Sequence, residues 1–201
     1  MSNLAEKTDN ISVDDYLSGE IISEIKHEYV QGQVYAMAGA KLRHNIISTN
    51  LSALLWHHLR GKPCFPFGSD MMLKTSEKSY RYPDLMVVCD TEVLDNPQIQ
   101  TTPVLIIEIL SKSTRQKDKG EKRLEYLALP SLQEYVLIEQ DFAEIEVQRK
   151  SKHWQSSYYF LGQDVFFESI NISLPVEEIY ERVDNDNMRL FLQQTNPTTS
   201  N

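Results

Sequence analysis

The sequence predicts an α/β protein in which helices flank a mixed β-sheet. Two observations predict this class: the patterns run in the order helix, three strands, helix, strand, and one strand, residues 103–111 (PVLIIEILS), is almost wholly aliphatic. A run this apolar is typical of a strand buried on both faces. The chain of 201 residues suits one domain, which we expect over residues 11–190 with disordered ends at 1–10 and 191–201.

The individual elements follow from local patterns. Residues 11–19 indicate a short capped helix, and residues 27–39 indicate an N-terminal hairpin module with a tight turn at Gly32. From Arg43 the apolar residues recur every three or four positions, which predicts a long helix that ends near Gly61. The other predicted elements are strands at 66–74, 82–89, 104–110 and 134–138, a loop at 96–103, a helix at 118–129, a C-terminal β-hairpin formed by an edge strand at 143–150 and a strand at 154–160, and a short helix at 173–183.

Composition excludes several classes of protein. No apolar run approaches the roughly 20 residues that a membrane-spanning helix needs, and the N-terminus has no hydrophobic signal core. We therefore expect a soluble, cytoplasmic protein. Cys64 and Cys89 lie far apart and lack the spacing of metal ligands, so we expect neither a zinc site nor a disulfide, and interpret both as small core residues.

The charge is acidic overall but basic in one segment. A net charge of −9 argues against a polyanionic partner, because repulsion slows association. Residues 112–123, however, hold six basic side chains against two acidic ones, a local balance of +4. This segment is either a solvated loop and helix start or a surface that contacts phosphates.

Two carboxylates lie in otherwise apolar strands: Asp84 opens one of them and Glu108 lies in the middle of the next. Burying an ionised carboxylate costs several kcal/mol unless a cation, a metal or a proton accompanies it. If the two strands are neighbours, about 4.8 Å apart, both side chains can converge on one divalent cation. Magnesium takes one or two carboxylates and leaves its other positions to water and substrate phosphate. The alternative is that Glu108 forms a buried ion pair and Asp84 caps or turns the chain after Pro83.

The pattern Pro83-Asp84, then Glu108, then basic residues resembles the PD-(D/E)XK nuclease superfamily. More closely, five segments resemble the Uma-type family of restriction-endonuclease-like proteins, and they cover most of residues 27–141: HEYVQGQVYAMAG, RHNIISTNL, YRYPDLMVVCD, PVLIIEILSKST and DKGEKRLEYLALPSLQEYVLIEQD. The resemblance implies a restriction-endonuclease-like core and a DNA endonuclease that depends on Mg²⁺ or Mn²⁺. It assigns the metal to Asp84 and Glu108, and a further catalytic carboxylate to Glu28, which is otherwise an exposed turn residue.

The catalytic lysine of the superfamily is displaced in this chain. Side chains two apart on a strand share a face, so the lysine belongs at position 110, which is Leu110. Lys112 reaches the same face only if the strand continues. Lys122, in the predicted second helix, is the candidate that we favour, provided that the helix packs through the line of Lys122 and Tyr126. If it packs through its other apolar line, Lys122 faces solvent.

Further residues have weaker claims on the site. His44, at the start of the long helix, either approaches the site or caps the turn, and we favour a cap or surface position. We interpret Tyr126 as packing, and Asp70 as a second-tier site residue or the cap of a bulge. Four cations of the basic segment are expected to contact the DNA backbone: Lys112, Arg115, Lys117 and Lys119. A homodimer that cuts both strands is plausible by the same resemblance. The competing hypothesis is a nuclease fold without catalytic activity that binds DNA or a protein partner.

Overall fold

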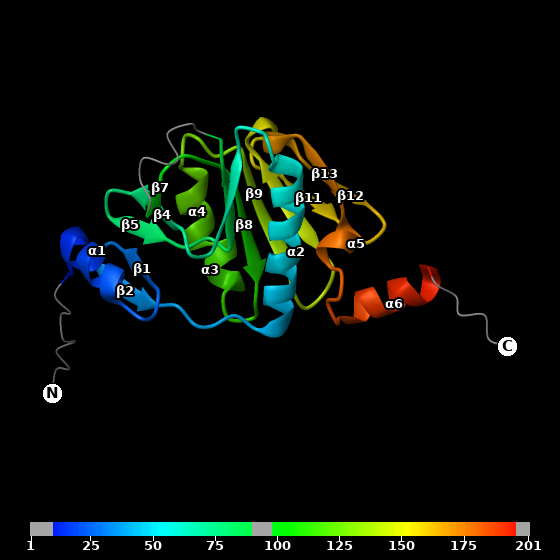
Figure 1. The fold of residues 1–201 in the computed structure, drawn as a ribbon, viewed down its shortest axis with the longest axis horizontal. Helices are drawn as coiled ribbons and strands as arrows, with labels where there is room; N and C mark the ends of the chain where they lie inside the picture. The colour runs from blue at the N-terminus through cyan, green and yellow to red at the C-terminus, as the bar shows by residue number, and fades with distance from the viewer. Residues whose placement is uncertain (1–9, 90–97, 196–201) are drawn as a thin grey trace.

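The computed structural model describes residues 10–89 and 98–195, and it has the predicted mixed α/β architecture (Figure 1). Its centre is a six-stranded sheet in which only the β8–β9 pair is parallel. In spatial order this sheet contains β11 (Ser156–Tyr159), β10 (Ile145–Arg149), β9 (Glu134–Glu139), β8 (Pro103–Leu110), β6 (Leu85–Val88) and β3 (Phe65–Gly68).

Two smaller sheets flank this central sheet. The five-stranded N-terminal sheet contains, in order, β2 (Gln33–Ala36), β1 (His27–Val30), β5 (Ser79–Arg81), β4 (Met72–Ser76) and β7 (Ile99–Gln100), and helix α1 (Val13–Ile22) packs on it. The hairpin β1–β2 turns through Gln31 and Gly32, both at positive φ, as the sequence predicts. The third sheet pairs β12 (Asp164–Phe167) with β13 (Ile172–Pro175).

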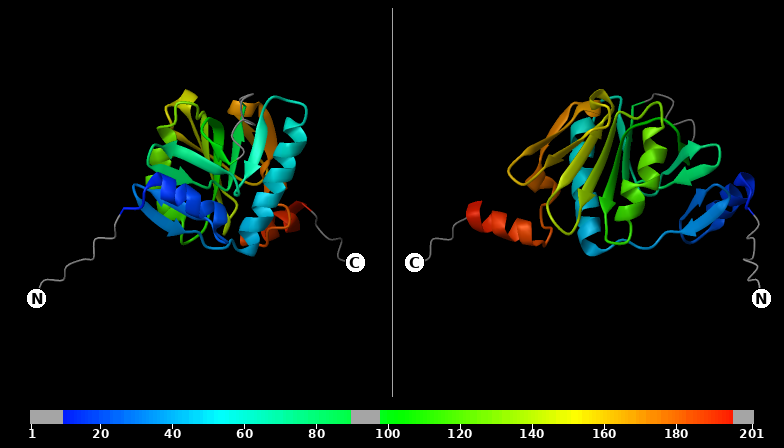
Figure 2. Two further views of the ribbon diagram at one scale, coloured as in Figure 1. Left: turned by 60° about the vertical axis from the view of Figure 1, so that its left-hand side comes forward. Right: turned by 180° about the vertical axis from the view of Figure 1, so that it is seen from behind.

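Helices cover both faces of the central sheet (Figure 2). The long helix α2 (Leu42–Leu59) packs against one face, and α3 (Arg115–Lys119) and α4 (Glu121–Leu127) lie on the other. Strand alternation sorts the side chains of β8: Leu105 and Ile107 join the core under α2, whereas Ile106 and Leu110 join the core under α4. Glu108 lies two residues from both Ile106 and Leu110, so its side chain is on the same face of the sheet as theirs and points toward α4. The chain continues through the 3₁₀ turns η2 (Lys150–Lys152) and η3 (Glu168–Ile170), and through α5 (Val176–Ile179) and α6 (Asp186–Thr195).

Several predicted boundaries are wrong in the structure. The strand expected at 66–74 is two strands in different sheets, because the chain turns between Gly68 and Asp70. The helix expected at 118–129 is broken at Gly120, and strand 143–150 is buried inside the sheet because β11 covers its edge. The expected loop 96–103 contains β7, although 96 and 97 lie outside the described residues. Helix α6 extends to Thr195, which corrects the disordered tail predicted from 191; residues 1–9 and 196–201 lie outside the described residues.

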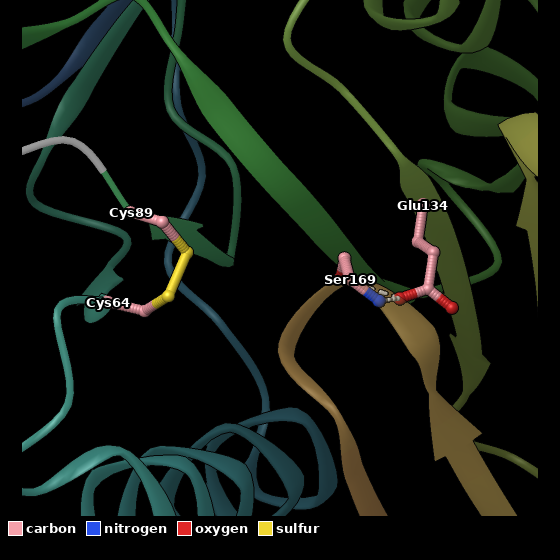
Figure 3. Close-up of a disulfide and its surroundings, with 4 residues drawn as sticks. All are labelled: Cys64, Cys89, Glu134 and Ser169. Carbon is pink, nitrogen blue, oxygen red and sulfur yellow. Dashed lines mark hydrogen bonds between the residues drawn. A yellow bond between two sulfur atoms is a disulfide. The ribbon is translucent and has the colours of Figure 1, made fainter.

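The cysteine prediction is also wrong. Cys64 and Cys89 form a disulfide between the ends of β3 and β6, as Figure 3 shows. Phe65 pairs with Val88 in the antiparallel ladder, so the two flanking cysteines lie opposite each other. Figure 3 also shows Ser169 beside Glu134, whose carboxylate accepts hydrogen bonds from the Ser169 backbone N–H and hydroxyl at 2.8 and 2.6 Å. Among the described residues, no helix is long and apolar enough to cross a membrane.

Candidate active site

Glu108 lies on the α4 face of strand β8, and its side chain is almost completely buried, with 3% of its surface exposed. Its Oε1 atom accepts a hydrogen bond from the Tyr126 hydroxyl at 2.9 Å and one from Lys122 Nζ at 3.0 Å. Both partners come from helix α4. One of the two Glu108 oxygens therefore contacts both a cation, Lys122, and a neutral hydrogen-bond donor, Tyr126.

Asp84 lies immediately before strand β6 and beside Glu108. Strands β6 and β8 are antiparallel neighbours, with Leu85 opposite Ile107, so the condition for the two carboxylates to converge is met. The Asp84 backbone N–H approaches Glu108 Oε2 at 3.4 Å, and the Ile109 backbone N–H donates to Asp84 Oδ2 at 2.7 Å. The sheet register therefore brings the two carboxylates together at one point.

Lys122 faces this point from helix α4. Its Nζ atom lies 3.0 Å from Glu108 Oε1, 3.1 Å from Glu28 Oε1 and 3.5 Å from Asp118 Oδ1. The helix packs through the line of Lys122 and Tyr126, whereas Leu124 is 69% exposed, so the alternative in which Lys122 faces solvent is wrong.

Lys112 does not reach the site by continuing the strand. Strand β8 ends at Leu110, and the chain then turns, leaving Lys112 exposed. Lys112 could act as the superfamily lysine only if the strand continued to it, and the strand does not.

Glu28 is buried on strand β1, not exposed in a turn. Its Oε2 atom accepts hydrogen bonds from Lys117 at 2.5 Å and from Arg81 Nη1 at 3.1 Å. Arg81 is itself fully buried, and its guanidinium also lies 2.6 Å from carboxylate oxygens of Glu121 and Glu125 on α4. This arginine links the N-terminal sheet to the helix that carries Lys122.

His44 approaches the same point from the first turn of α2. Its Nε2 atom lies 3.1 Å from Asp84 Oδ2, and only 17% of its side chain is exposed. The interpretation of His44 as a cap or surface residue is therefore wrong: the helix begins at Lys41 as N-cap, and the imidazole turns inward.

The electrostatics differ sharply between the two glutamates. Burial raises the pKa of Glu108 to about 8, with the Lys122 charge acting against it and the charges of Asp84 and Asp118 adding to it. Burial also opposes ionisation of Glu28, but the charge of Lys122 and the hydrogen bond from Lys117 lower its pKa to about 2. Burial likewise opposes the charge of Lys122, yet the surrounding carboxylates raise its pKa well above the usual value. Lys122 is therefore a permanent cation between acidic groups.

These groups line one cavity of about 880 Å³, which includes Glu28, His44, Asp84, Glu108 and Lys122. Asp84 lines this cavity, so its carboxylate lies beside the space that a ligand would occupy. The described residues contain no cluster of three or more His, Cys, Asp or Glu side chains that could hold a metal alone. Two hard oxygen donors beside a cavity fit magnesium or manganese, which keep several positions for water and phosphate, and do not fit a fully enclosed zinc site.

Three of the four cations predicted to contact DNA are instead paired within the protein. Arg115 lies 2.5 Å from Glu139, Lys117 binds Glu28, and Lys119 lies 3.4 Å from Glu146. Lys112 is the member of the set that forms no ion pair with any described residue. The basic segment is therefore largely neutralised by carboxylates that face it.

Sequence reasoning missed Arg81 and Asp118 and undervalued Tyr126. The spacing of Asp118 and Lys122, four residues apart on a helical pattern, was a signal for their contact. Arg81 gave no comparable signal. Asp70 lies at the rim of the cavity, where its side chain is 96% exposed and pairs with Lys26 at 2.8 Å.

A mixed sheet flanked by helices, with acidic residues on two central strands and a lysine on the covering helix, defines a restriction-endonuclease-like protein. The particular family follows from the sequence: residues 13–177 match the model of Uma2, described as a putative restriction endonuclease, and the chain belongs to this family.

Two sequence relatives and one solved structure are similar to this chain. The uncharacterized protein slr1290 of Synechocystis sp. is 35% identical over 173 residues, covering 85% of this chain and 91% of its own. A second uncharacterized Synechocystis protein, sll1609, is 40% identical over 139 residues, covering 68% and 78%. The crystal structure of a putative nuclease of DUF820 from Anabaena variabilis has a TM-score of 0.72 at 18% identity, covering 85% of this chain and 97% of its own. At that identity the likeness shows a shared fold.

Proposed function

We propose that this protein is a metal-dependent phosphodiesterase that hydrolyses DNA, with Asp84 and Glu108 as the ligands of Mg²⁺ or Mn²⁺. The observation that carries the proposal is the convergence of these two carboxylates from adjacent strands with the ammonium of Lys122 in one open cavity. A bound divalent ion would supply charge neutralisation at the scissile phosphate and acidify a bound water.

The side chains of this protein have separate roles in the proposal. Lys122 lies next to Glu108 and stabilises the negative charge that develops on the phosphate, or positions the attacking water. Glu28 assists by holding Lys122 from the opposite side at 3.1 Å. His44 and the Ile109 backbone N–H both contact Asp84 Oδ2, and in this proposal they hold the Asp84 carboxylate in its position beside the cavity.

Hydrolysis assays with isosteric variants test this proposal. The purified protein is incubated with supercoiled plasmid and with bis(p-nitrophenyl) phosphate, in Mg²⁺ or Mn²⁺. We expect Asp84→Asn, Glu108→Gln and Lys122→Met to lose activity by at least about 100-fold, the scale seen when one electrostatic contact to a transition state is removed. The matched control is Glu24→Gln, an exposed carboxylate that lines the same cavity, and it should keep full activity.

Metal binding gives a second readout that does not require turnover. Calorimetric titration with Mn²⁺ should show a site that disappears in Asp84→Asn and persists in Glu24→Gln. Activity that survives in Glu108→Gln would indicate a contaminating nuclease. If the intact protein neither cleaves nor binds Mn²⁺, the competing hypothesis of a nuclease fold that only binds DNA or a protein partner replaces the proposal.

The proposal includes a homodimer, because two active sites can cut both strands of a duplex in one encounter. It also places the protein in the cytoplasm. Light scattering on the protein with and without a short duplex tests the homodimer independently. A monomer in both conditions would limit the proposed activity to nicking.

A further inference from the structure

A cationic groove opens beside the active-site cavity. It has a volume of about 490 Å³ and contains two acidic residues, Asp141 and Asp184. Its basic lining residues are Lys41, Arg43, Lys112 and Arg182. The groove is therefore positively charged, although the whole chain has a net charge of −9.

The charges of this groove are accessible. Lys41 and Lys112 are exposed and form no ion pair with any residue in ranges 10–89 and 98–195. Arg43 lies 3.4 Å from Asp141 with 39% of its side chain exposed, and exposed pairs of this kind contribute only about 0–1 kcal/mol, so a phosphate can compete for the arginine.

The two acidic residues of the groove reduce its positive charge only in part. Asp184 is already paired with Arg189 on α6. Arg182 lies 3.7 Å from Glu181, but its side chain is 87% exposed, and an ion pair this exposed leaves the arginine open to a competing phosphate. Its backbone is left-handed with φ of 62°, a region that favours glycine. An arginine there carries a local conformational cost, which is consistent with a function for its side chain.

The groove adjoins the active-site cavity. Lys41, Ser111, Ser113 and Gln140 line both of them. The start of α2, the turn after β8 and the segment before α6 meet at this end of the central sheet (Figure 1). A chain that occupies the cavity at Asp84 can therefore extend directly into the groove.

We propose that this groove binds the phosphodiester backbone of the DNA strand that enters the active site, through Lys41, Arg43, Lys112 and Arg182. The inference rests on the proposed function, since it places the scissile phosphate beside Asp84. It places the main backbone contacts here and not at Arg115, Lys117 and Lys119, whose charges already pair with buried carboxylates. Contacts of this type fix the position of the strand without reading its sequence.

The test measures binding without turnover. Fluorescence anisotropy gives the Kd of a labelled 20-base-pair duplex in EDTA, at several KCl concentrations, for the protein, Lys41→Gln, Lys112→Gln and Lys62→Gln. The control Lys62 is exposed and lies beyond the other end of the same helix α2, whose 18 residues span about 27 Å at 1.5 Å per residue. We expect each groove variant to raise Kd about five- to tenfold and to reduce the log–log salt slope by about 1, while Lys62→Gln matches the wild type.

Three outcomes overturn the inference: no duplex binding by the wild-type protein, unchanged Kd in both groove variants, or an equal loss in Lys62→Gln. A duplex RNA of the same length is measured in parallel, and binding of RNA alone also overturns the assignment to DNA. Hydrolysis of bis(p-nitrophenyl) phosphate by the wild-type protein decides the proposed function separately, because this small diester does not need the groove.

Discussion

Replacing Glu28 by glutamine should destabilise the protein by an amount that depends on pH. The folded-state pKa of Glu28 is about 2 and its ordinary value is 4.5, because Lys122, Lys117 and Arg81 outweigh the effect of burial. A pKa difference of between two and three units, at about 1.4 kcal/mol per unit, corresponds to about 3 kcal/mol of stability at pH 7. Glutamine has the shape of the protonated carboxyl, so Glu28→Gln should lose this contribution.

The sign follows from the direction of the shift. Because the folded pKa is depressed, the contribution is fully present above the unfolded pKa and is lost as pH falls through the folded pKa. The difference between wild type and Glu28→Gln should therefore shrink from about 3 kcal/mol at pH 7 to about 1 kcal/mol at pH 3.

Urea unfolding at 25 °C over this pH range measures the difference. The control Glu24→Gln removes an exposed carboxylate of the same module that forms no ion pair among the described residues, and it should change stability by less than about 0.5 kcal/mol. A loss below about 1 kcal/mol at pH 7, or a loss that is constant with pH, would refute the reasoning.

Three further changes have defined outcomes. Tyr126→Phe removes a buried donor 2.9 Å from a carboxylate oxygen and should lower the free energy of unfolding by about 1.5–3 kcal/mol; an unchanged urea midpoint would contradict this. Leu51→Ala, at a fully buried position, should cost about 2–5 kcal/mol, whereas Leu51→Met should cost less than about 1.5 kcal/mol, and equal losses would show that no cavity forms. Reducing the disulfide between Cys64 and Cys89, which lie 25 residues apart, should cost about 3.5 kcal/mol, and the double serine variant must then be insensitive to the reductant.

The two central carboxylates could be predicted from the sequence because each interrupts an apolar strand. Glu108 is conspicuous among Leu and Ile, and Asp84 opens the strand that precedes it in the chain. Consecutive strands are usually neighbours, so their convergence was a reasonable expectation. The inward direction of Lys122 also followed from its helical spacing to Tyr126.

The remaining contacts depend on which elements meet in space. The neutralisation of Arg115 and Lys119 comes from Glu139 and Glu146, which lie on strands after the basic segment, and charge counting along the chain does not show such pairing. The disulfide depends on the pairing of β3 with β6, which the spacing of two cysteines does not specify. The division of the predicted strand 66–74 into two strands, by contrast, could have been predicted, because Gly68 and the polar residues after it are typical of a turn.

Strand β6 is four residues long, and both of its ends are anchored: Asp84 hydrogen-bonds to β8 at one end, and Cys89 is covalently attached to the edge strand at the other. Adding or deleting one residue between these anchors would turn either the carboxylate or the sulfur to the opposite face of the sheet. The number of residues in β6 is therefore more strictly constrained than their identity. In directed evolution, β6 should tolerate the exchange of one apolar residue for another far better than an insertion or a deletion.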